Sequence, residues 1–135
     1  MAARLLVSET DFQRLSGLID SFKQFFRRDQ EHVRVLEEEL NRAEVVDAKR
    51  LPRGVVTMNS RVRVTDLDTG MQTVYTLSFP RDADISDNRL SVLAPLGTAI
   101  LGYRAGAIVR AHVPGGSKRL KIEEVTTAAT PTKAA

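Results

Sequence analysis

The fold of the second part of this chain is decided by one stretch, Leu90-Ser91-Val92-Leu93-Ala94-Pro95-Leu96-Gly97-Thr98-Ala99-Ile100-Leu101-Gly102. Its first three residues predict a short strand. Proline suits the first helical position and glycine the position after a helix, so Pro95 and Gly102 predict a short helix over Pro95–Leu101. Ala94 falls at the N-cap of that helix, where a serine-type cap is worth about 0.5–2 kcal/mol. Gly97 and Gly102 predict close packing around the helix.

Segments with alternating or β-branched residues lie on both sides of this stretch and predict an antiparallel sheet. The predicted strands are Val55-Val56-Thr57, Arg61-Val62-Arg63-Val64, Thr73-Val74-Tyr75-Thr76-Leu77, Ala107–Val113 and Arg119–Val125. Asp68-Thr69-Gly70 and Pro114-Gly115-Gly116-Ser117 supply the turns, and Asp84–Asn88 is a polar loop. The predicted sheet domain covers residues 51–125. Thr126–Ala135 is small and polar, and we predict a disordered tail there.

The first part of the chain predicts two amphipathic helices. Ser8 and Asp11 have the spacing of a capping box, which places a helix start after Ser8, and Val7 and Phe12 fall where a hydrophobic staple belongs. Apolar residues then recur three and four apart, which is the spacing of a coiled-coil seam. The first seam is Phe12, Leu15, Ile19, Phe22 and Phe26, with Leu18 and Phe25 beside it, and the second is Val33, Leu36, Leu40 and Ala43.

The two predicted helices are separated only by Arg27-Arg28-Asp29-Gln30, in which Asp29 is a candidate N-cap. Helices joined so tightly are expected to be antiparallel neighbours, each about 19 residues or roughly 28 Å long. Lys49-Arg50-Leu51-Pro52 ends the helical pattern, because proline disfavours a helical residue before it. The hairpin arm therefore covers residues 1–50. Its seam is expected to pack on the following domain or on a dimer mate, and Glu37-Glu38-Glu39 is expected to be a solvated face.

The predicted fold class is α+β, an antiparallel helical hairpin followed by an antiparallel sheet with one short helix. The 135 residues are 42% hydrophobic and 27% charged, which suits a small globular chain. There is no cysteine, which excludes disulfides and thiolate chemistry. With only His32 and His112, and with no phosphate-binding or hydrolase motif, neither a metal nor another cofactor is expected. No apolar run approaches the roughly 20 residues that span a bilayer, so we expect no membrane contact and a cytoplasmic location.

The net charge of +3 is divided unevenly, with −1 in residues 1–50 and +4 in residues 51–135. Such an excess could favour nucleic acid or an acidic protein surface. The basic residues of the predicted strands are interpreted as solvated strand faces rather than a phosphate track, because no aromatic residues interleave with them. They are Arg61, Arg63, Lys118, Arg119 and Lys121.

Three segments resemble the C-terminal domain of the bacterial Gre transcript-cleavage factors. They are Gly54-Val55-Val56-Thr57-Met58-Asn59-Ser60-Arg61-Val62, Leu90–Gly102 and Pro114-Gly115-Gly116. The resemblance covers roughly residues 50–125, and its Val-Thr-Met-Asn-Ser and Ala-Pro-Leu-Gly forms are most similar to the Rnk group of this family, the regulators of nucleoside diphosphate kinase. It implies an FKBP-like fold that docks on RNA polymerase near the rim of the secondary channel, with weak nucleic-acid contact only inside that complex.

The resemblance also implies which residues dock. In Gre factors two polar residues precede the proline of the short helix, whereas Leu93 and Ala94 stand before Pro95 here. The expected polymerase-docking residues are Leu93, Ala94, Pro95 and Leu96, which make a more apolar surface. The resulting hypothesis is a non-enzymatic regulator of Rnk type that competes with Gre factors and has no catalytic residues. The sequence makes no prediction of its oligomeric state.

The expected arm tip is formed by Arg27, Arg28, Asp29 and Glu31. Gre factors stimulate transcript cleavage with two carboxylates at the tip of a longer arm, which help to hold a magnesium ion inside the polymerase. In a helix, residues two apart point away from each other, so Asp29 and Glu31 do not converge, and the two arginines repel a cation. Stimulation of cleavage by a backtracked polymerase is therefore the alternative hypothesis.

Two further alternatives have less support. Prolyl isomerase activity rests on the FKBP-like fold alone, and a fold does not specify a function. An isomerase pocket needs clustered aromatic residues, of which this domain offers Tyr75, Phe79 and Tyr103. Direct DNA binding rests only on the basic excess.

Overall fold

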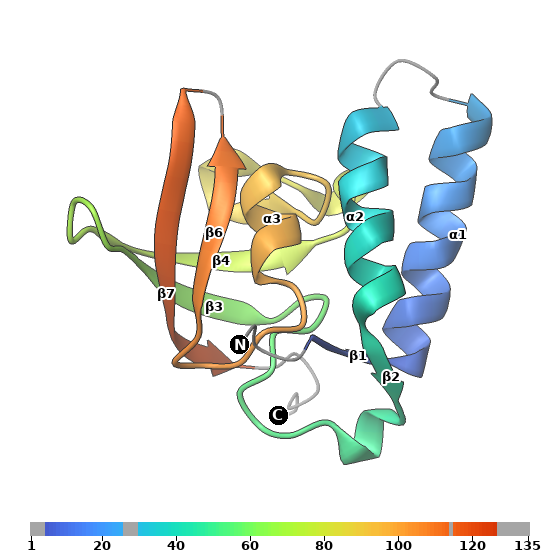
Figure 1. The fold of residues 1–135 in the computed structure, drawn as a ribbon, viewed down its shortest axis with the longest axis horizontal. Coiled ribbons are helices and arrows are strands. Elements are labelled where there is room, and N and C mark those ends of the chain that lie inside the picture. The colour runs from blue at the N-terminus through green and yellow to red at the C-terminus, as the bar shows by residue number, and fades with distance from the viewer. Residues whose placement is uncertain (1–4, 26–29, 114, 127–135) are drawn as a thin grey trace.

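The computed structural model describes residues 5–25, 30–113 and 115–126, which fold into a helical hairpin packed beside a curled sheet (Figure 1). The hairpin consists of α1 (Glu9–Phe25) and α2 (Gln30–Arg42). Helix α2 lies between α1 and the short helix α3 (Pro95–Ile100) of the sheet domain. This arrangement confirms the α+β class. None of the described helices is both long and apolar enough to cross a membrane.

The start and the seams of the hairpin agree with the sequence pattern. The Ser8 hydroxyl accepts a hydrogen bond from the Asp11 amide at 3.1 Å, which is the predicted N-cap contact. Phe12, Phe22 and Ala43 of the two seams are half-buried, whereas the other described seam residues are almost fully buried and form the hairpin core. The almost fully buried residues are Leu15, Ile19, Val33, Leu36 and Leu40. Phe26, the last residue of the first predicted seam, lies outside the described residues.

The hairpin seam packs on the sheet domain within the same chain. Leu36 and Leu40 belong to one continuous hydrophobic core that also contains Val92 and Ile100 of the domain. Lys23 and Glu37 join the two helices by an ion pair of 2.7 Å on the outer side, and Glu38 is exposed. The expected packing on the following domain is therefore confirmed.

The prediction for the end of the second helix is wrong. Helix α2 has 13 residues, about 20 Å at 1.5 Å per residue, and ends at Arg42 rather than before Pro52. Strand β2 (Glu44–Val46) follows and pairs in parallel with β1 (Leu6–Ser8), and a 3₁₀ turn, η2 (Ala48–Arg50), comes next. The β-branched pair Val45-Val46 suits a strand, and the Glu44 amide donates to the Leu5 carbonyl at 2.8 Å.

The main sheet has five strands in the order β5-β4-β3-β7-β6. Its strands are β3 (Arg61–Asp66), β4 (Gln72–Ser78), β5 (Arg89–Ser91), β6 (Ile108–Val113) and β7 (Gly116–Thr126). All neighbours are antiparallel except β4 and β5, which are parallel and so depart from the expected antiparallel sheet. Thr126 belongs to β7, and the rest of the predicted tail lies outside the described residues.

Val55-Val56-Thr57 is not a strand, contrary to the prediction. Both valines are buried, but only an isolated bridge links Val55 to Arg104. The chain then turns at Asn59, whose φ is 68°, and the Ser60 hydroxyl accepts from the Thr57 amide at 2.9 Å. The two successive hydrophobic residues Val55 and Val56 are therefore explained by burial in a loop and not by a strand. The predicted polar loop Asp84–Asn88 contains one 3₁₀ turn, η4 (Ile85–Asp87), and a second one, η3 (Pro80–Asp82), precedes it.

Candidate docking groove

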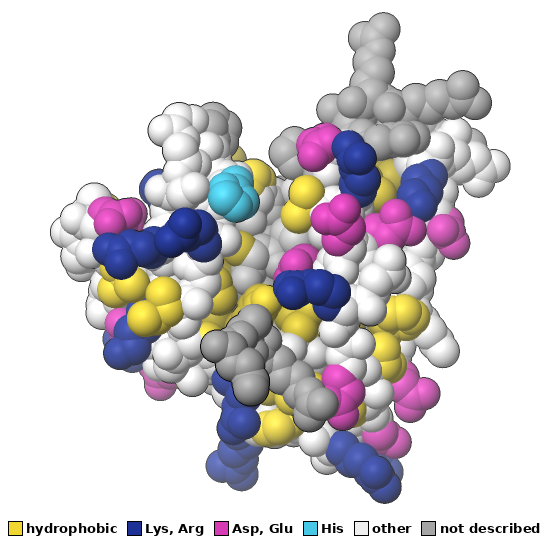
Figure 2. All heavy atoms as spheres, in the orientation of Figure 1, with side chains coloured by type: hydrophobic (Ala, Val, Ile, Leu, Met, Phe, Trp, Pro, Cys, Tyr) yellow, Lys and Arg dark blue, Asp and Glu magenta, His cyan; other side chains and the backbone are white. Residues whose placement is uncertain are grey.

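A groove opens between α2, α3 and β6, and we call it the α2–α3–β6 groove. Helix α2 forms one wall and the free edge of β6 forms the other, while α3 and its flanking residues form the floor. The lining residues are Glu31, Val35, Glu39, Arg42, Leu93, Pro95, Thr98, Ala99, Tyr103, Ile108, Val109, Arg110, Ala111 and His112. Figure 2 looks onto this face, where hydrophobic side chains lie between the helical hairpin and the strands β6 and β7.

The floor is positioned by helix α3. Pro95 begins the helix, and Ala94 provides no side-chain cap, as the sequence predicts. The hydroxyl of buried Thr98 instead donates to the Val92 carbonyl at 2.5 Å, which ties the helix to the chain before it. A Cβ on Gly97 would lie on the backbone carbonyl of Ser91, so only glycine allows α3 this close to β5.

The far end of α3 is joined to the hairpin. Gly102 has a φ of 82°, as expected for a glycine that follows a helix. Its carbonyl accepts from the Leu6 amide at 3.0 Å, and its amide donates to the Val56 carbonyl at 2.9 Å. A Cβ on Gly102 would collide with the Leu5 side chain. Backbone hydrogen bonds therefore tie the end of α3 to β1, the strand that leads into the hairpin, and to the buried loop at Val56.

The wall formed by α2 combines an apolar residue with a charged rim. Val35 is 43% exposed although it is a large aliphatic residue. Arg42 pairs with Glu39 at 2.8 Å and contacts the Tyr103 hydroxyl at 3.4 Å. The nearby Glu39 carboxylate, with a smaller contribution from Tyr103, raises the pKa of the Arg42 guanidinium above its ordinary value. Through its contacts with Glu39 and Tyr103, Arg42 links α2 to the floor.

The wall formed by β6 alternates between buried and exposed residues. Val109 and Ala111 point into the core, whereas Ile108, Arg110 and His112 are exposed. Ile108 is 64% exposed, so the groove has an uncovered aliphatic side chain on each wall. A groove lined mainly by apolar side chains, with a few charged groups among them, is the usual form of a binding site.

The predicted docking residues are all half-buried, and the structure divides them into two pairs. Leu93 and Pro95 line the groove, whereas Ala94 and Leu96 do not, and Leu96 packs against the core. Sequence reasoning missed Val35, Tyr103 and Ile108. Val35 lies off the buried seam, and Ile108 is an aliphatic residue at an outward position of β6. An aliphatic residue at a solvent-facing position is the signal in the sequence that could have identified Val35 and Ile108 as contact residues.

The arm tip is only partly described. Arg27, Arg28 and Asp29 lie outside the described residues. Glu31 is exposed in the first turn of α2 and pairs with Arg34 at 2.6 Å, and this carboxylate raises the pKa of Arg34. Among the residues that the structure describes, no group of three or more histidine, aspartate or glutamate side chains could hold a metal ion.

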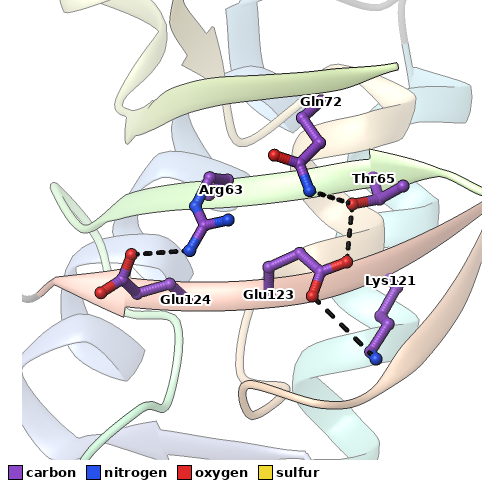
Figure 3. Close-up of polar contacts among 6 residues, drawn as sticks. All are labelled: Arg63, Thr65, Gln72, Lys121, Glu123 and Glu124. Atoms are coloured by element: carbon purple, nitrogen blue, oxygen red, sulfur yellow. Dashed lines mark hydrogen bonds and ion pairs between the residues drawn. The ribbon is translucent and has the colours of Figure 1, made fainter. Parts of the chain in front are cut away.

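Most basic residues of the sheet have acidic partners. Arg63 contacts Glu124 at 2.9 Å, and Lys121 is 4.0 Å from Glu123, which also accepts from the Thr65 hydroxyl (Figure 3). Further along the sheet, Arg119 pairs with Asp68 and Lys118 with Asp66, at 3.1 and 3.8 Å. These pairs neutralise much of the basic excess and favour solvated strand faces over a phosphate track. Exposed pairs of this kind contribute only about 0.2–1 kcal/mol each.

The aromatic side chains of the domain do not form one pocket. Tyr103 lines the α2–α3–β6 groove. Phe79 lines a different groove, beside Leu18 and Phe22 of α1. This separation gives no support to a prolyl isomerase pocket.

Two family models match the chain. The model described as "Transcription elongation factor, GreA/GreB, C-term" matches residues 51–127, and "Rnk N-terminus" matches residues 4–46. The first match contains α3 and β6, and the second contains α1 and α2.

The chain is also similar to individual proteins. It is 43% identical over 81 residues to the Escherichia coli regulator of nucleoside diphosphate kinase, a match covering 60% of each chain. It is 34% identical over 93 residues to the transcription elongation factor GreA of Rhodospirillum rubrum, which covers 69% of this chain and 59% of that one. The matches thus span about three fifths of these relatives. A solved GreA/GreB elongation factor structure from Nitrosomonas europaea is 38% identical with a TM-score of 0.75, covering 92% of this chain and 100% of that one.

Proposed function

Because the chain belongs to the GreA/GreB transcription elongation factor family, we propose that it is a non-enzymatic regulator of Rnk type that binds RNA polymerase. It docks near the secondary channel through the α2–α3–β6 groove and competes with Gre factors for that site. The proposal is carried by one observation. The segment through which the resemblance implies docking contributes Leu93 and Pro95 to an apolar groove on the described surface.

The physical chemistry of the groove supports binding of a protein surface. Its centre is apolar, with exposed Val35 and Ile108 on its walls, and its rim carries charged groups such as Glu39 and Arg110. An apolar centre inside a polar rim is the usual anatomy of a protein interface. The floor is held by backbone contacts at Gly97 and Gly102, so it needs little rearrangement to bind.

Binding is tested by immobilising core RNA polymerase and measuring its affinity for the native chain and for two variants. Leu93→Asp combined with Pro95→Ala places a charge in the groove, and we expect the affinity for polymerase to fall at least tenfold, or about 1.4 kcal/mol. The control is Ile85→Asp, which adds the same charge at an aliphatic residue that is 90% exposed and lies outside the groove. Equal affinities of the double variant and the control would contradict the proposal, provided that both unfold like the native chain.

Competition is a separate test. At saturating concentrations of this chain, a labelled Gre factor should be displaced from core polymerase. Undiminished Gre binding would refute the shared site. The name of the E. coli relative states that it regulates nucleoside diphosphate kinase. If this chain acts through polymerase, any effect of it on that kinase is regulatory and indirect.

Stimulation of transcript cleavage is the alternative function. The described part of the arm gives it no support, because the Glu31 carboxylate is engaged by Arg34 and α2 is only 13 residues long. Helix α1 has 17 residues and spans about 26 Å at 1.5 Å per residue. A carboxylate pair that reaches a metal deep inside polymerase needs a longer arm.

A further inference from the structure

Strand β6 forms one edge of the main sheet, and half of its backbone groups point away from its partner. The Ala107 carbonyl accepts from the Ile122 amide at 2.9 Å, directly before the antiparallel pairing of β6 with β7 begins. Because the bonding direction alternates along an antiparallel pair, Val109 and Ala111 also direct their N–H and C=O groups toward β7. Ile108, Arg110 and His112 therefore direct theirs toward the free edge. Within the described residues, no second strand pairs with β6.

This free edge opens into the α2–α3–β6 groove. All five residues Ile108–His112 line it in succession, as expected when a groove runs along a strand. An unpaired strand edge is a template for another extended chain, because its amides and carbonyls are already aligned. A strand that bonded to Ile108, Arg110 and His112 would become the sixth strand of the sheet.

Side chains of such a strand would alternate between two chemically different surfaces. On the inner side, residues opposite Val109 and Ala111 would meet the apolar floor at Leu93 and Ala99. On the outer side, a residue opposite Arg110 would meet positive charge. Figure 2 shows Lys and Arg side chains gathered over β6 and β7 on this side of the groove.

Arg110 is the main charge available to a partner. It is exposed, and among the described residues it has neither an acidic partner nor a hydrogen-bonded one. Arg119 stands directly opposite it on β7, and Lys121 stands opposite Ile108. Both are paired with acids of their own, Asp68 and Glu123, so Arg110 is the cation in this row that a partner's acid could meet.

We propose that the free edge of β6 binds an extended segment of a partner protein in which apolar and acidic residues alternate. The segment pairs with β6, places its apolar residues on the groove floor and places an acidic residue beside Arg110. A second copy of this chain fits less well, because a two-fold pairing centred on Arg110 would add a second copy's arginines to the row that Arg110 and Arg119 already form across β6 and β7. The inference does not depend on polymerase being the partner.

The direct test uses a fluorescent peptide that alternates valine and glutamate, titrated into the full chain. A peptide that alternates valine and lysine, and the glutamate peptide with N-methylated backbone amides, serve as controls. We expect binding of the glutamate peptide only. We also expect slower hydrogen exchange at the amides of Ile108, Arg110 and His112 in its presence, because these donors then face the new strand. Absence of both effects at millimolar peptide would overturn the proposal.

Two pairs of variants separate backbone pairing from charge. Ile108→Pro removes an edge amide at the first residue of β6, where proline is tolerated, and Ile108→Ala removes the side chain alone. The proline variant should abolish peptide binding and the alanine variant should weaken it by less. Arg110→Glu should raise the Kd about five- to tenfold, whereas Arg61→Glu on β3, outside the groove, should leave it unchanged.

The remaining outcomes also decide the proposal. Unchanged binding by Ile108→Pro, with the native unfolding transition preserved, would show that β6 does not pair and would overturn it. Concentration-dependent dimerisation that Ile108→Pro abolishes would assign the edge to a second copy and would also overturn it. If Ile108→Pro loses peptide binding but keeps polymerase binding, the proposal for β6 stands, and its partner is a protein other than RNA polymerase.

Discussion

The contact that most clearly fixes the groove floor is the hydrogen bond from the Thr98 hydroxyl to the Val92 carbonyl. Thr98 is 3% exposed and the bond is 2.5 Å long. Thr98→Val keeps the shape of the side chain and removes the donor, so the buried carbonyl of Val92 is left without this partner. A buried polar group that loses its partner costs about 1–3 kcal/mol, and we expect the free energy of unfolding to fall by that amount.

The measurement is urea-induced unfolding of the native chain, Thr98→Val and Thr98→Ser. The serine variant keeps the hydroxyl and loses one methyl group, so it should lose only about 0.8 kcal/mol. Because the floor of the groove depends on the same contact, Thr98→Val should also weaken polymerase binding more than Thr98→Ser does. A change below about 0.5 kcal/mol in Thr98→Val, within the range of ordinary surface substitutions, would refute the role of this bond.

Three further outcomes follow from the same structure. Ala94→Ser supplies the cap that α3 lacks, in a backbone conformation suited to it, and should raise the free energy of unfolding by about 0.5–2 kcal/mol; no gain would show that the serine hydroxyl does not cap α3. Burial raises the pKa of Asp11 above 3.8, against the opposing hydrogen bond from the Met58 amide, so this carboxyl stabilises the fold below about pH 3.8 and less as pH rises through its folded pKa. The free energy of unfolding of Asp11→Asn, measured by urea titration relative to the native chain, should therefore be higher at neutral pH than at acid pH. A difference between the two chains that does not change with pH would contradict the raised pKa of Asp11. When the chain is added to a stalled RNA polymerase complex with labelled RNA and magnesium, no shortened transcript should appear. Cleavage that Glu31→Ala abolishes would show instead that the arm tip stimulates cleavage.

Local signals predicted those parts of the fold that depend on nearby residues. The Ser8 cap, the seam through Leu15 and Leu36, and the helix bracketed by Pro95 and Gly102 all follow from spacing within a few residues. Each rests on contacts within one helix or across one hairpin. Such contacts are the ones that the order of residues encodes directly.

The errors concern pairings between distant segments. Val45 pairs with Val7, nearly forty positions earlier in the chain, and this contact converts the end of a predicted helix into β2. Val55 and Val56 are buried by the rest of the domain, so their hydrophobicity carries no information about strand pairing. Tertiary contacts override local propensity in both places.

The candidate site was predicted only in part for the same reason. Leu93 and Pro95 were identified through the resemblance, whereas Val35 and Ile108 come from elements that only the folded chain brings together. Strand β6 as a free edge could not be inferred either, because the strand order of a sheet is not written in any one segment. The groove is therefore a property of topology.

Docking of RNA polymerase on the α2–α3–β6 groove can be measured by site-specific photo-crosslinking. A benzophenone amino acid replaces Ile108 in one variant and Met71, on the turn between β3 and β4, in the other. These residues are 64% and 67% exposed, so the two probes are equally accessible. With core polymerase, docking on this groove should give crosslinks from position 108 and none from position 71. Crosslinks from position 71 alone, or equal crosslinks from both, would contradict it.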